Sequence, residues 1–176
     1  MPADRFVEAL QLQIARELGA AQQYLAVAIW YDHQTFPRLA GLFYEQAAEE
    51  RSHAMMMVQY LLDCGLRPPV PGVAEPTADF ADFVEPVRIS LDQERKVTEQ
   101  ISQLVAIARD EGDYLSEQFM QWFLKEQVEE IDLFSSLLDV AERSRERPMD
   151  VEEYIAREAV GAGAEDPTAP PAAGAG

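Results

Sequence analysis

The sequence predicts an all-α protein: a four-helix bundle with one long connection between its second and third helices and a short fifth helix near the C-terminus. Three observations favour this fold. Four long stretches have the apolar periodicity of amphipathic helices and no internal proline. Strand signals are absent. Two of the three connections are short, whereas the middle one is long and rich in proline.

The first predicted helix covers about residues 4–33, and the second starts near Pro37 and stops at Gly65. Proline is favoured in the first turn of a helix, and glycine just after its end. Apolar residues that recur every three or four positions give each helix one buried stripe. The stripe residues are Phe6, Leu10, Ile14, Leu18, Ala21, Leu25 and Ala28 in the first helix, and Leu39, Phe43, Met57 and Leu61 in the second.

The third and fourth predicted helices cover about residues 84–111 and 114–145. Their stripe residues are Val87, Leu91, Ile101, Val105 and Ala108 in the third helix, and Met120, Phe123, Phe134, Leu138 and Ala141 in the fourth. Short connections at residues 34–36 and 112–113 make each pair of consecutive helices antiparallel. The sequence thus predicts two helical hairpins.

About 19 residues, including four prolines and Gly72, separate the two hairpins. At about 3.3 Å per extended residue they can span a helix of about 40 Å, so we expect a crossover along the bundle, with a loose surface loop as the alternative. After Pro148 we expect a short fifth helix, opened by a capping-box-like pair, Asp150 and Glu153, and ended by Gly161. Residues 1–160 then form one domain, and 161–176 a disordered tail rich in Gly, Ala and Pro.

The chain is strongly acidic, with 32 acidic and 14 basic residues and a net charge of −18. This balance argues against nucleic acid as a partner, because phosphate binding needs clustered Lys and Arg. It suits attraction of cations, although acidity can also serve solubility alone. No apolar run is long enough to span a membrane, no signal peptide is evident, and the single Cys64 fits a cytoplasmic location.

Polar residues interrupt all four apolar stripes. They are Glu17 in the first helix, Glu50 and His53 in the second, Glu94 in the third, and Gln127 and Glu130 in the fourth. Buried carboxylates are costly unless they are paired, hydrogen-bonded or bound to a metal. A bundle whose buried polar residues only fix helix pairing is the structural alternative; such a bundle would bind no stoichiometric metal.

The spacing of these residues indicates a single site. Glu17 and Glu94, Glu50 and Gln127, and His53 and Glu130 are each separated by 77 residues. Two hairpins related by a pseudo-two-fold axis would therefore bring all six residues to one level. Oxygen ligands with one imidazole suit iron or manganese, and zinc less well. Further carboxylates at that level, from Glu49, Glu126, Glu129 and Glu130, suffice for a third, weaker cation site.

With these motifs in place, residues 1–160 resemble the non-haem bacterial ferritins. The second Glu-x-x-His of the ferritin-like di-iron pattern is replaced here by Gln127-x-x-Glu130, as in the non-haem type. The resemblance implies that Glu17, Glu50 and His53 hold one iron, and Glu50 and Glu94 the second, with Glu130 as a ligand and Gln127 as a ligand or hydrogen-bond partner. It also implies a third iron site of Glu49, Glu126 and Glu129, sharing Glu130, and electron donation by Tyr24 and Trp122.

The implied function is iron storage with ferroxidase activity: oxidation of Fe(II) by O2 or H2O2, and storage of ferric oxyhydroxide in a hollow shell of 24 identical subunits. Because Ser52 stands where bacterioferritin has a haem-binding Met, we predict no haem. A relative of rubrerythrin would need a Cys-x-x-Cys module, which one cysteine rules out. DNA-protecting mini-ferritins usually lack the long crossover and fifth helix.

Overall fold

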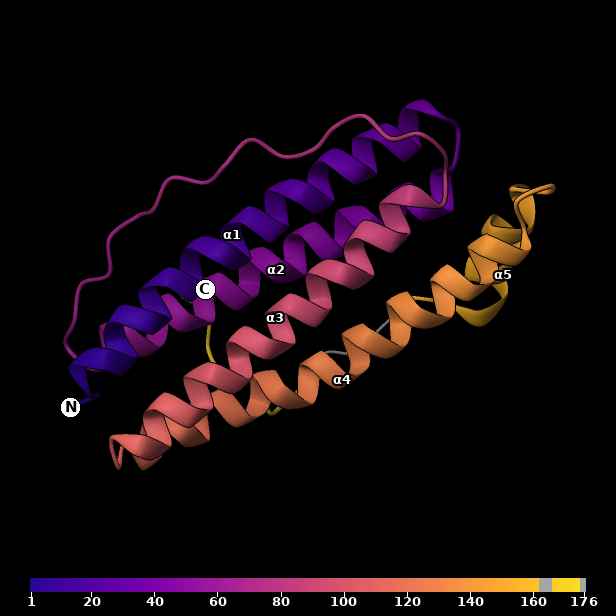
Figure 1. Ribbon diagram of the computed structural model, residues 1–176. Helices are drawn as coiled ribbons and strands as arrows, with labels where there is room; N and C mark the ends of the chain where they lie inside the picture. The colour runs from indigo at the N-terminus through magenta and orange to yellow at the C-terminus, as the bar shows by residue number, and fades with distance from the viewer. Residues whose placement is uncertain (162–165, 175–176) are drawn as a thin grey trace.

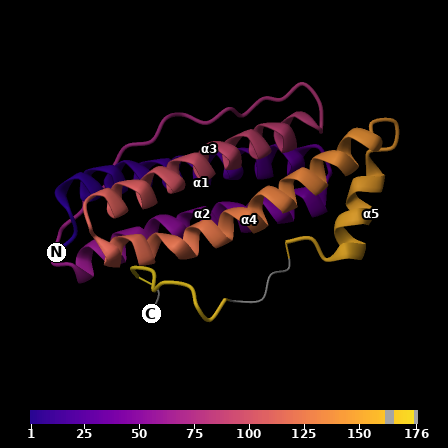
Figure 2. The ribbon, with the colours of Figure 1, turned by 60° about the horizontal axis from the view of Figure 1, so that its bottom comes forward.

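The computed structural model, which describes residues 1–161 and 166–174, is a bundle of four long helices with a short fifth helix across one end (Figures 1 and 2). The helices are α1 Asp4–His33, α2 Pro37–Asp63, α3 Glu85–Asp110, α4 Tyr114–Arg143 and α5 Met149–Glu158. No strand occurs in the described part of the chain. The predicted all-α fold is confirmed, with helix boundaries within about two residues of those expected for the four long helices.

The connections position the helices as predicted. Gly65 and Gly112 have φ angles of 77° and 67°, the left-handed conformation that glycine adopts easily at a helix end. Asp113 caps α4 by accepting a hydrogen bond from Ser116 N at 3.1 Å. The crossover, residues 64–84, runs along the bundle beside α1 (Figure 1). Gln23 of α1 fixes it there, donating to Thr77 O at 2.8 Å and accepting from Thr77 N at 3.0 Å.

The apolar core consists of two clusters, one toward each end of the bundle. The upper cluster, near α5, includes Tyr24, Tyr31, Phe43, Leu91, Phe134 and Ile155. The lower cluster, near the N-terminus, includes Phe6, Leu10, Met57, Ile101, Met120 and Phe123. The buried polar residues singled out by the sequence lie along the helices between these two sets. Apolar packing at both ends therefore holds a polar layer in the middle of the bundle.

Two details of the predicted stripes are wrong. Leu25 is 38% exposed, whereas its neighbours Tyr24 and Val27 are fully buried. In α4, Leu137 rather than Leu138 is fully buried. An α-helix has about 3.6 residues per turn, so side chains four residues apart do not lie directly above one another. Three successive steps of four residues, as from position 6 to position 18, rotate the stripe by about 120° around the helix. The predicted stripe in α1 therefore drifted off the buried face.

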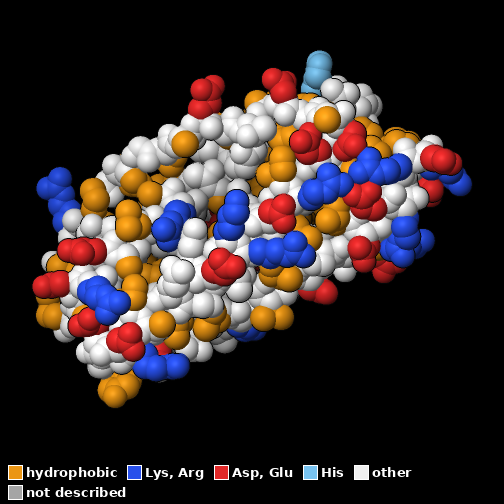
Figure 3. Space-filling model, in the orientation of Figure 1, with side chains coloured by type: hydrophobic (Ala, Val, Ile, Leu, Met, Phe, Trp, Pro, Cys, Tyr) orange, Lys and Arg blue, Asp and Glu red, His pale blue; other side chains and the backbone are white. Residues whose placement is uncertain are grey.

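The surface carries both signs of charge. On the face shown in Figure 3, Lys and Arg side chains are interspersed among Asp and Glu. That face therefore carries no large patch of a single charge sign. None of the helices in the described ranges contains a segment apolar and long enough to cross a bilayer.

The start of α5 also differs from the prediction. Its N-cap residue is Pro148, no side chain caps it, and Asp150 lies inside its first turn. Instead of a capping box, Glu152 reaches from α5 to the first turn of α2. Its carboxylate accepts hydrogen bonds from Arg38 N at 2.7 Å and Leu39 N at 2.9 Å. Backbone N–H groups in the first turn have no partner within their own helix, so this buried carboxylate caps α2 and docks α5.

We expect Glu152→Ala to loosen α5 and to lower the free energy of unfolding by about 1–3 kcal/mol, because two backbone N–H groups, one of them buried, lose their acceptor. Thermal unfolding measures the effect. The control is Glu153→Ala, which removes an exposed carboxylate from the same helix. Equal unfolding temperatures for the two variants would contradict the docking role of Glu152.

The C-terminal tail departs from the predicted disorder where it is described. Residues 162–165 and 175–176 lie outside the described residues. Residues 166–174, which we call the C-terminal strap, lie against α2 and α4, on the side of the bundle opposite the crossover (Figure 2). Ala173 N donates to Met55 O of α2 at 3.0 Å. Small residues therefore allow this segment to pack closely on the helices.

Candidate metal centre

The six polar residues of the predicted site occupy the layer between the two apolar clusters, and none is more than 5% exposed. Three of them converge directly: Glu17, Glu50 and His53 each offer a ligand atom within 4.8 Å of the others. His53 Nδ1 lies 4.0 Å from Glu17 Oε2 and 3.7 Å from Glu50 Oε2. Helices α1 and α2 thus bring an imidazole and two carboxylates together.

Glu94 enters from α3 and is positioned by two neighbours. The Tyr24 hydroxyl donates a hydrogen bond to Glu94 Oε1. Gln127 Nε2 donates to Glu94 Oε2 at 3.1 Å and lies 3.2 Å from Thr98 Oγ1. Gln127 and Tyr24 together therefore fix the carboxylate of Glu94.

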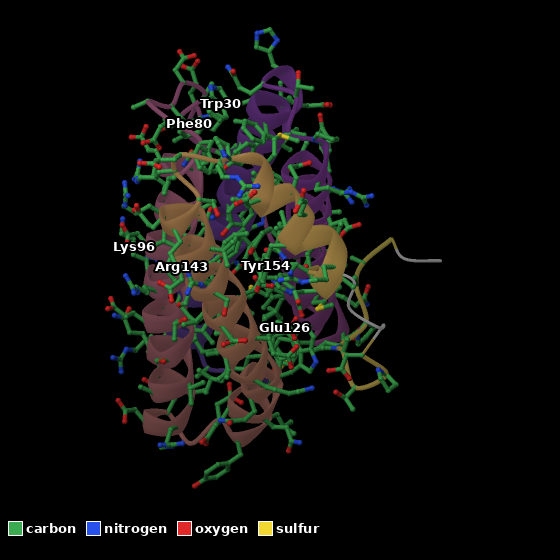
Figure 4. The ribbon with its side chains drawn as sticks, turned by 90° about the vertical axis from the view of Figure 1, so that its right-hand side faces the viewer. Trp30, Phe80, Lys96, Glu126, Arg143 and Tyr154 are labelled. Atoms are coloured by element: carbon green, nitrogen blue, oxygen red, sulfur yellow. The ribbon has the colours of Figure 1, made fainter. Side chains whose placement is uncertain are left out.

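Glu130 joins a second acidic group. Glu49, Glu126 and Glu130 also offer ligand atoms within 4.8 Å of one another, and Glu126 lies between α4 and α2 (Figure 4). Gln46 donates to Glu49 Oε2 at 2.9 Å and to Glu130 Oε1 at 3.4 Å. Glu129 is not within this group but lines the adjoining cavity. The predicted third set is thus assembled from Glu49, Glu126 and Glu130, with Glu129 beside it.

Two buried glutamines were missed by the sequence analysis. Gln13 donates to Glu17 Oε1 at 2.7 Å and accepts from Arg16 Nη1 at 3.1 Å. Gln46 bridges Glu49 and Glu130 within the second acidic group, as described above. Each glutamine precedes a site carboxylate, Glu17 or Glu50, by four residues, which places it on the same face of the helix. That spacing was the signal that could have found them.

Two aromatic residues flank the centre from opposite ends. Tyr24 belongs to the upper cluster and packs against the rings of Phe43 and Phe134. Trp122 packs against the lower cluster and presents its indole edge-on to His53, with ring centroids 5.6 Å apart. The hydroxyl of Tyr24 contacts a site carboxylate, whereas the indole N–H of Trp122 points to Asp166 of the strap.

Electrostatics distinguishes this layer from an ordinary bundle interior. Burial raises the pKa of Glu17, Glu50 and Glu94, and the neighbouring carboxylates raise it further. Burial and the nearby Glu94 carboxylate raise the pKa of Glu130 to about 9. Burial also raises the pKa of Tyr24 well above its usual value. Protein groups alone leave these acids poorly stabilised in their ionised form.

Orphaned oxygen atoms complete the geometry. Glu17 Oε2, Glu50 Oε2 and Glu130 Oε2 are buried without a hydrogen-bond partner. Each such acceptor costs about 1–3 kcal/mol. Divalent cations would satisfy these oxygens and neutralise the carboxylates, and a set of oxygens with one imidazole matches iron or manganese. The residues present therefore fit bound iron.

Comparison with known proteins agrees with the fold. Residues 7–144 match the ferritin-like domain family. The chain belongs to the ferritin family. Over 170 residues it is 51% identical to Ferritin BfrB of Mycolicibacterium smegmatis, covering 97% of this ferritin and 93% of that protein. Over 143 residues it is 36% identical to the bacterial non-heme ferritin of Staphylococcus aureus, covering 81% and 86% of the two chains.

Other relatives broaden the comparison. The Mycobacterium tuberculosis relative, named Bacterioferritin BfrB, is 50% identical over 157 residues and is covered to 87% of its length, with 89% of this ferritin aligned. Among solved structures, an open-pore ferritin from Archaeoglobus fulgidus superposes with a TM-score of 0.83 at 26% identity, covering 92% of this ferritin and 99% of that chain. As a ferritin, the protein is an iron-storage protein.

Proposed function

We propose that this ferritin oxidises Fe(II) to Fe(III) at a two-iron centre within each subunit and stores the product as ferric oxyhydroxide in a hollow shell of 24 copies. The observation that supports this proposal most directly is the buried polar layer. In it, three carboxylate oxygens lack any hydrogen-bond partner and lie among further acids and one imidazole. A purely structural polar layer would be expected to pair these oxygens. Their lack of partners is explained if iron is the partner.

The residues have distinct roles in this proposal. Glu17, Glu50 and His53 hold one Fe(II). Glu50 and Glu94 hold the other together with Glu130, while Gln127 and Tyr24 fix the orientation of Glu94. The two ions supply two electrons, which reduce O2 to H2O2 with two protons, or H2O2 to water. The burial of the layer keeps competing solvent away from the reacting ions.

A third cation site is proposed at Glu49, Glu126 and Glu130, with Glu129 nearby. These residues connect the buried layer with the cavity between α2 and α4. Such a site would receive iron that moves to or from the two-iron centre. Tyr24 and Trp122 are proposed as additional electron donors during the reduction of oxygen, because both lie beside site residues.

The subunit is proposed to contain no haem. Ser52 precedes the site histidine and offers no soft ligand for haem iron. The methionines nearby serve the core instead, since Met56 and Met57 belong to the lower apolar cluster. Absence of a Soret band after purification from haem-supplemented cells would agree with this; a stoichiometric band would contradict it.

The assembly and location follow the same proposal. Residues 1–160 form the ferritin-like domain, and α5, at one end of the bundle, would contribute to the contacts that close the shell (Figure 2). The cytoplasm is the proposed location, in keeping with a single free thiol, Cys64. Light scattering tests the shell directly, because 24 copies of a 19.7 kDa chain have a mass far above that of any small oligomer.

Anaerobic titration with Fe(II) tests the sites. We expect two tightly bound ions per subunit and one bound more weakly. Glu126→Ala should remove the weak ion and retain the tight pair, because Glu126 belongs only to the second acidic group, which consists of Glu49, Glu126 and Glu130. Glu99→Ala, which removes an exposed carboxylate of α3, is the matched control. Fewer than two ions bound to the wild-type subunit would refute the two-iron centre.

A further inference from the structure

The C-terminal strap is tied to α4 through one side chain. The carboxylate of Asp166 accepts a hydrogen bond from Trp122 Nε1 at 3.1 Å and lies 2.9 Å from Lys125 Nζ. Ala169 and Ala172 pack against the lower apolar cluster, and Ala173 donates to the backbone of α2. The strap thus bridges α2 and α4 over the second acidic group.

Under the strap lies an open cavity of about 960 Å³. Its walls include four carboxylates, from Glu45, Glu49, Glu126 and Glu129, and the strap supplies Asp166 and Ala169. His53 belongs to both the cavity wall and the buried centre, and Glu49 and Glu126 belong to both the wall and the second acidic group. An ion that travels between the centre and the α2/α4 face therefore has an acid-lined route beneath the strap.

Lys125 is the one lysine or arginine among the described residues of this wall. It precedes Glu129 by four residues, so the two side chains are neighbours on one face of α4. A Lys125 ammonium that turned toward Glu129 would occupy a cation-binding carboxylate and repel divalent ions. In the structure the ammonium is instead paired with Asp166.

We propose that Asp166 of the strap pairs with the Lys125 ammonium on the cavity wall and so keeps Glu126 and Glu129 available for iron. Asp166 is a positioning residue, which acts on the cation route through Lys125 and not by binding the ion. This inference rests on the proposed function, because it concerns the traffic of iron to and from the two-iron centre. Docking of the strap would then set how readily cations enter the cavity.

The test is a double-mutant cycle in the full-length shell, read by terbium luminescence. A Trp30→Phe background leaves Trp122 as the only indole of the two in the chain, so sensitised emission reports Tb(III) bound beside this cavity. Four proteins are compared: the background itself, Asp166→Ala, Lys125→Ala and the double variant. A chain ended at Gly161 serves as the strap-free form.

Asp166→Ala and the strap-free chain should bind Tb(III) about three- to tenfold more weakly, because a freed ammonium within several ångströms of the ion opposes binding. Lys125→Ala should change the affinity less than twofold while Asp166 is present. In the Asp166→Ala background the same change should restore most of the lost affinity. The deficit should shrink at high ionic strength, since salt screens partly exposed charges.

Additive effects of the two changes would overturn the proposal, because they would mean that each charge acts independently. A double variant as weak as Asp166→Ala would overturn it as well, since Asp166 would then itself bind the ion. Unchanged Tb(III) affinity of the strap-free chain would also overturn the proposal. Glu111→Ala, which breaks an exposed pair with Arg5, controls for the loss of any surface carboxylate. Anaerobic Fe(II) stoichiometry, measured in parallel on the wild type, separates this failure from failure of the two-iron centre.

Discussion

Glu50→Ala is expected to slow Fe(II)-dependent oxygen uptake by about 100-fold or more while leaving the shell assembled. Glu50 lies in the centre of the polar layer, with one orphaned oxygen and with His53 Nδ1 3.7 Å from that oxygen. In the proposed function it is the carboxylate that both irons share, so its loss would disrupt the pairing of the ions on which oxidation depends. An oxygen electrode measures the rate, and light scattering measures the mass.

Two further variants keep this test decisive. Glu50→Gln preserves the size of the side chain and should be as inactive, because a neutral amide is a poor ligand for iron. Glu99→Ala should retain the wild-type rate, since that carboxylate is exposed on α3. An assembled Glu50→Gln shell that oxidises iron at the wild-type rate would remove Glu50 from the centre.

The iron-free protein is expected to lose stability as the pH rises from about 5 to about 9. The folded-state pKa values of Glu17, Glu50, Glu94 and Glu130 are raised by burial, that of Glu130 to about 9. Between the usual pKa of about 4.3 and these higher values, the folded protein holds more protons than the unfolded chain. Raising the pH therefore favours unfolding, by up to about 1.4 kcal/mol per pH unit for each such group.

Divalent metal should reverse this trend. Metal replaces the protons on the same carboxylates, so Fe(II) under anaerobic conditions should raise the unfolding temperature most at high pH, and binding should release protons. The Asp82 and Asp113 carboxyls have lowered pKa values, so they titrate below this window. Calorimetric scans at several pH values measure the effect, and Glu50→Gln should show a weaker slope. A flat or rising unfolding temperature in the iron-free protein would contradict the electrostatic account.

Much of the centre could be predicted because two repeated spacings encode it. The 77-residue offset relates His53 to Glu130 and Glu17 to Glu94, and a buried charge on an apolar stripe is informative by itself. Helix boundaries followed from Pro37, Gly65 and Gly112, whose backbone preferences are local. Those properties belong to single residues or to one helix, so the sequence carries them directly.

Other features depend on contacts between distant segments. Glu152 was indistinguishable from the exposed Glu153 until α5 was placed against the first turn of α2. Gln13 carries no charge, so its place on a stripe drew no attention despite its bond to Glu17. The composition of the tail predicted disorder, yet Asp166 finds Trp122 and Lys125 more than 40 residues away. Tertiary pairing of this kind leaves no periodic signal.

The division of the apolar core into two clusters determines the direction from which the acids can be reached. Apolar side chains fill both ends of the bundle, so a charged species cannot move along the bundle axis without losing its hydration. An ion that enters from the side, between α2 and α4, instead meets the carboxylates of the cavity wall. Ions and protons would therefore exchange with the centre through the α2/α4 face of the subunit. Substitutions on that face would alter the kinetics of iron loading, whereas substitutions in the apolar ends would alter the stability of the bundle.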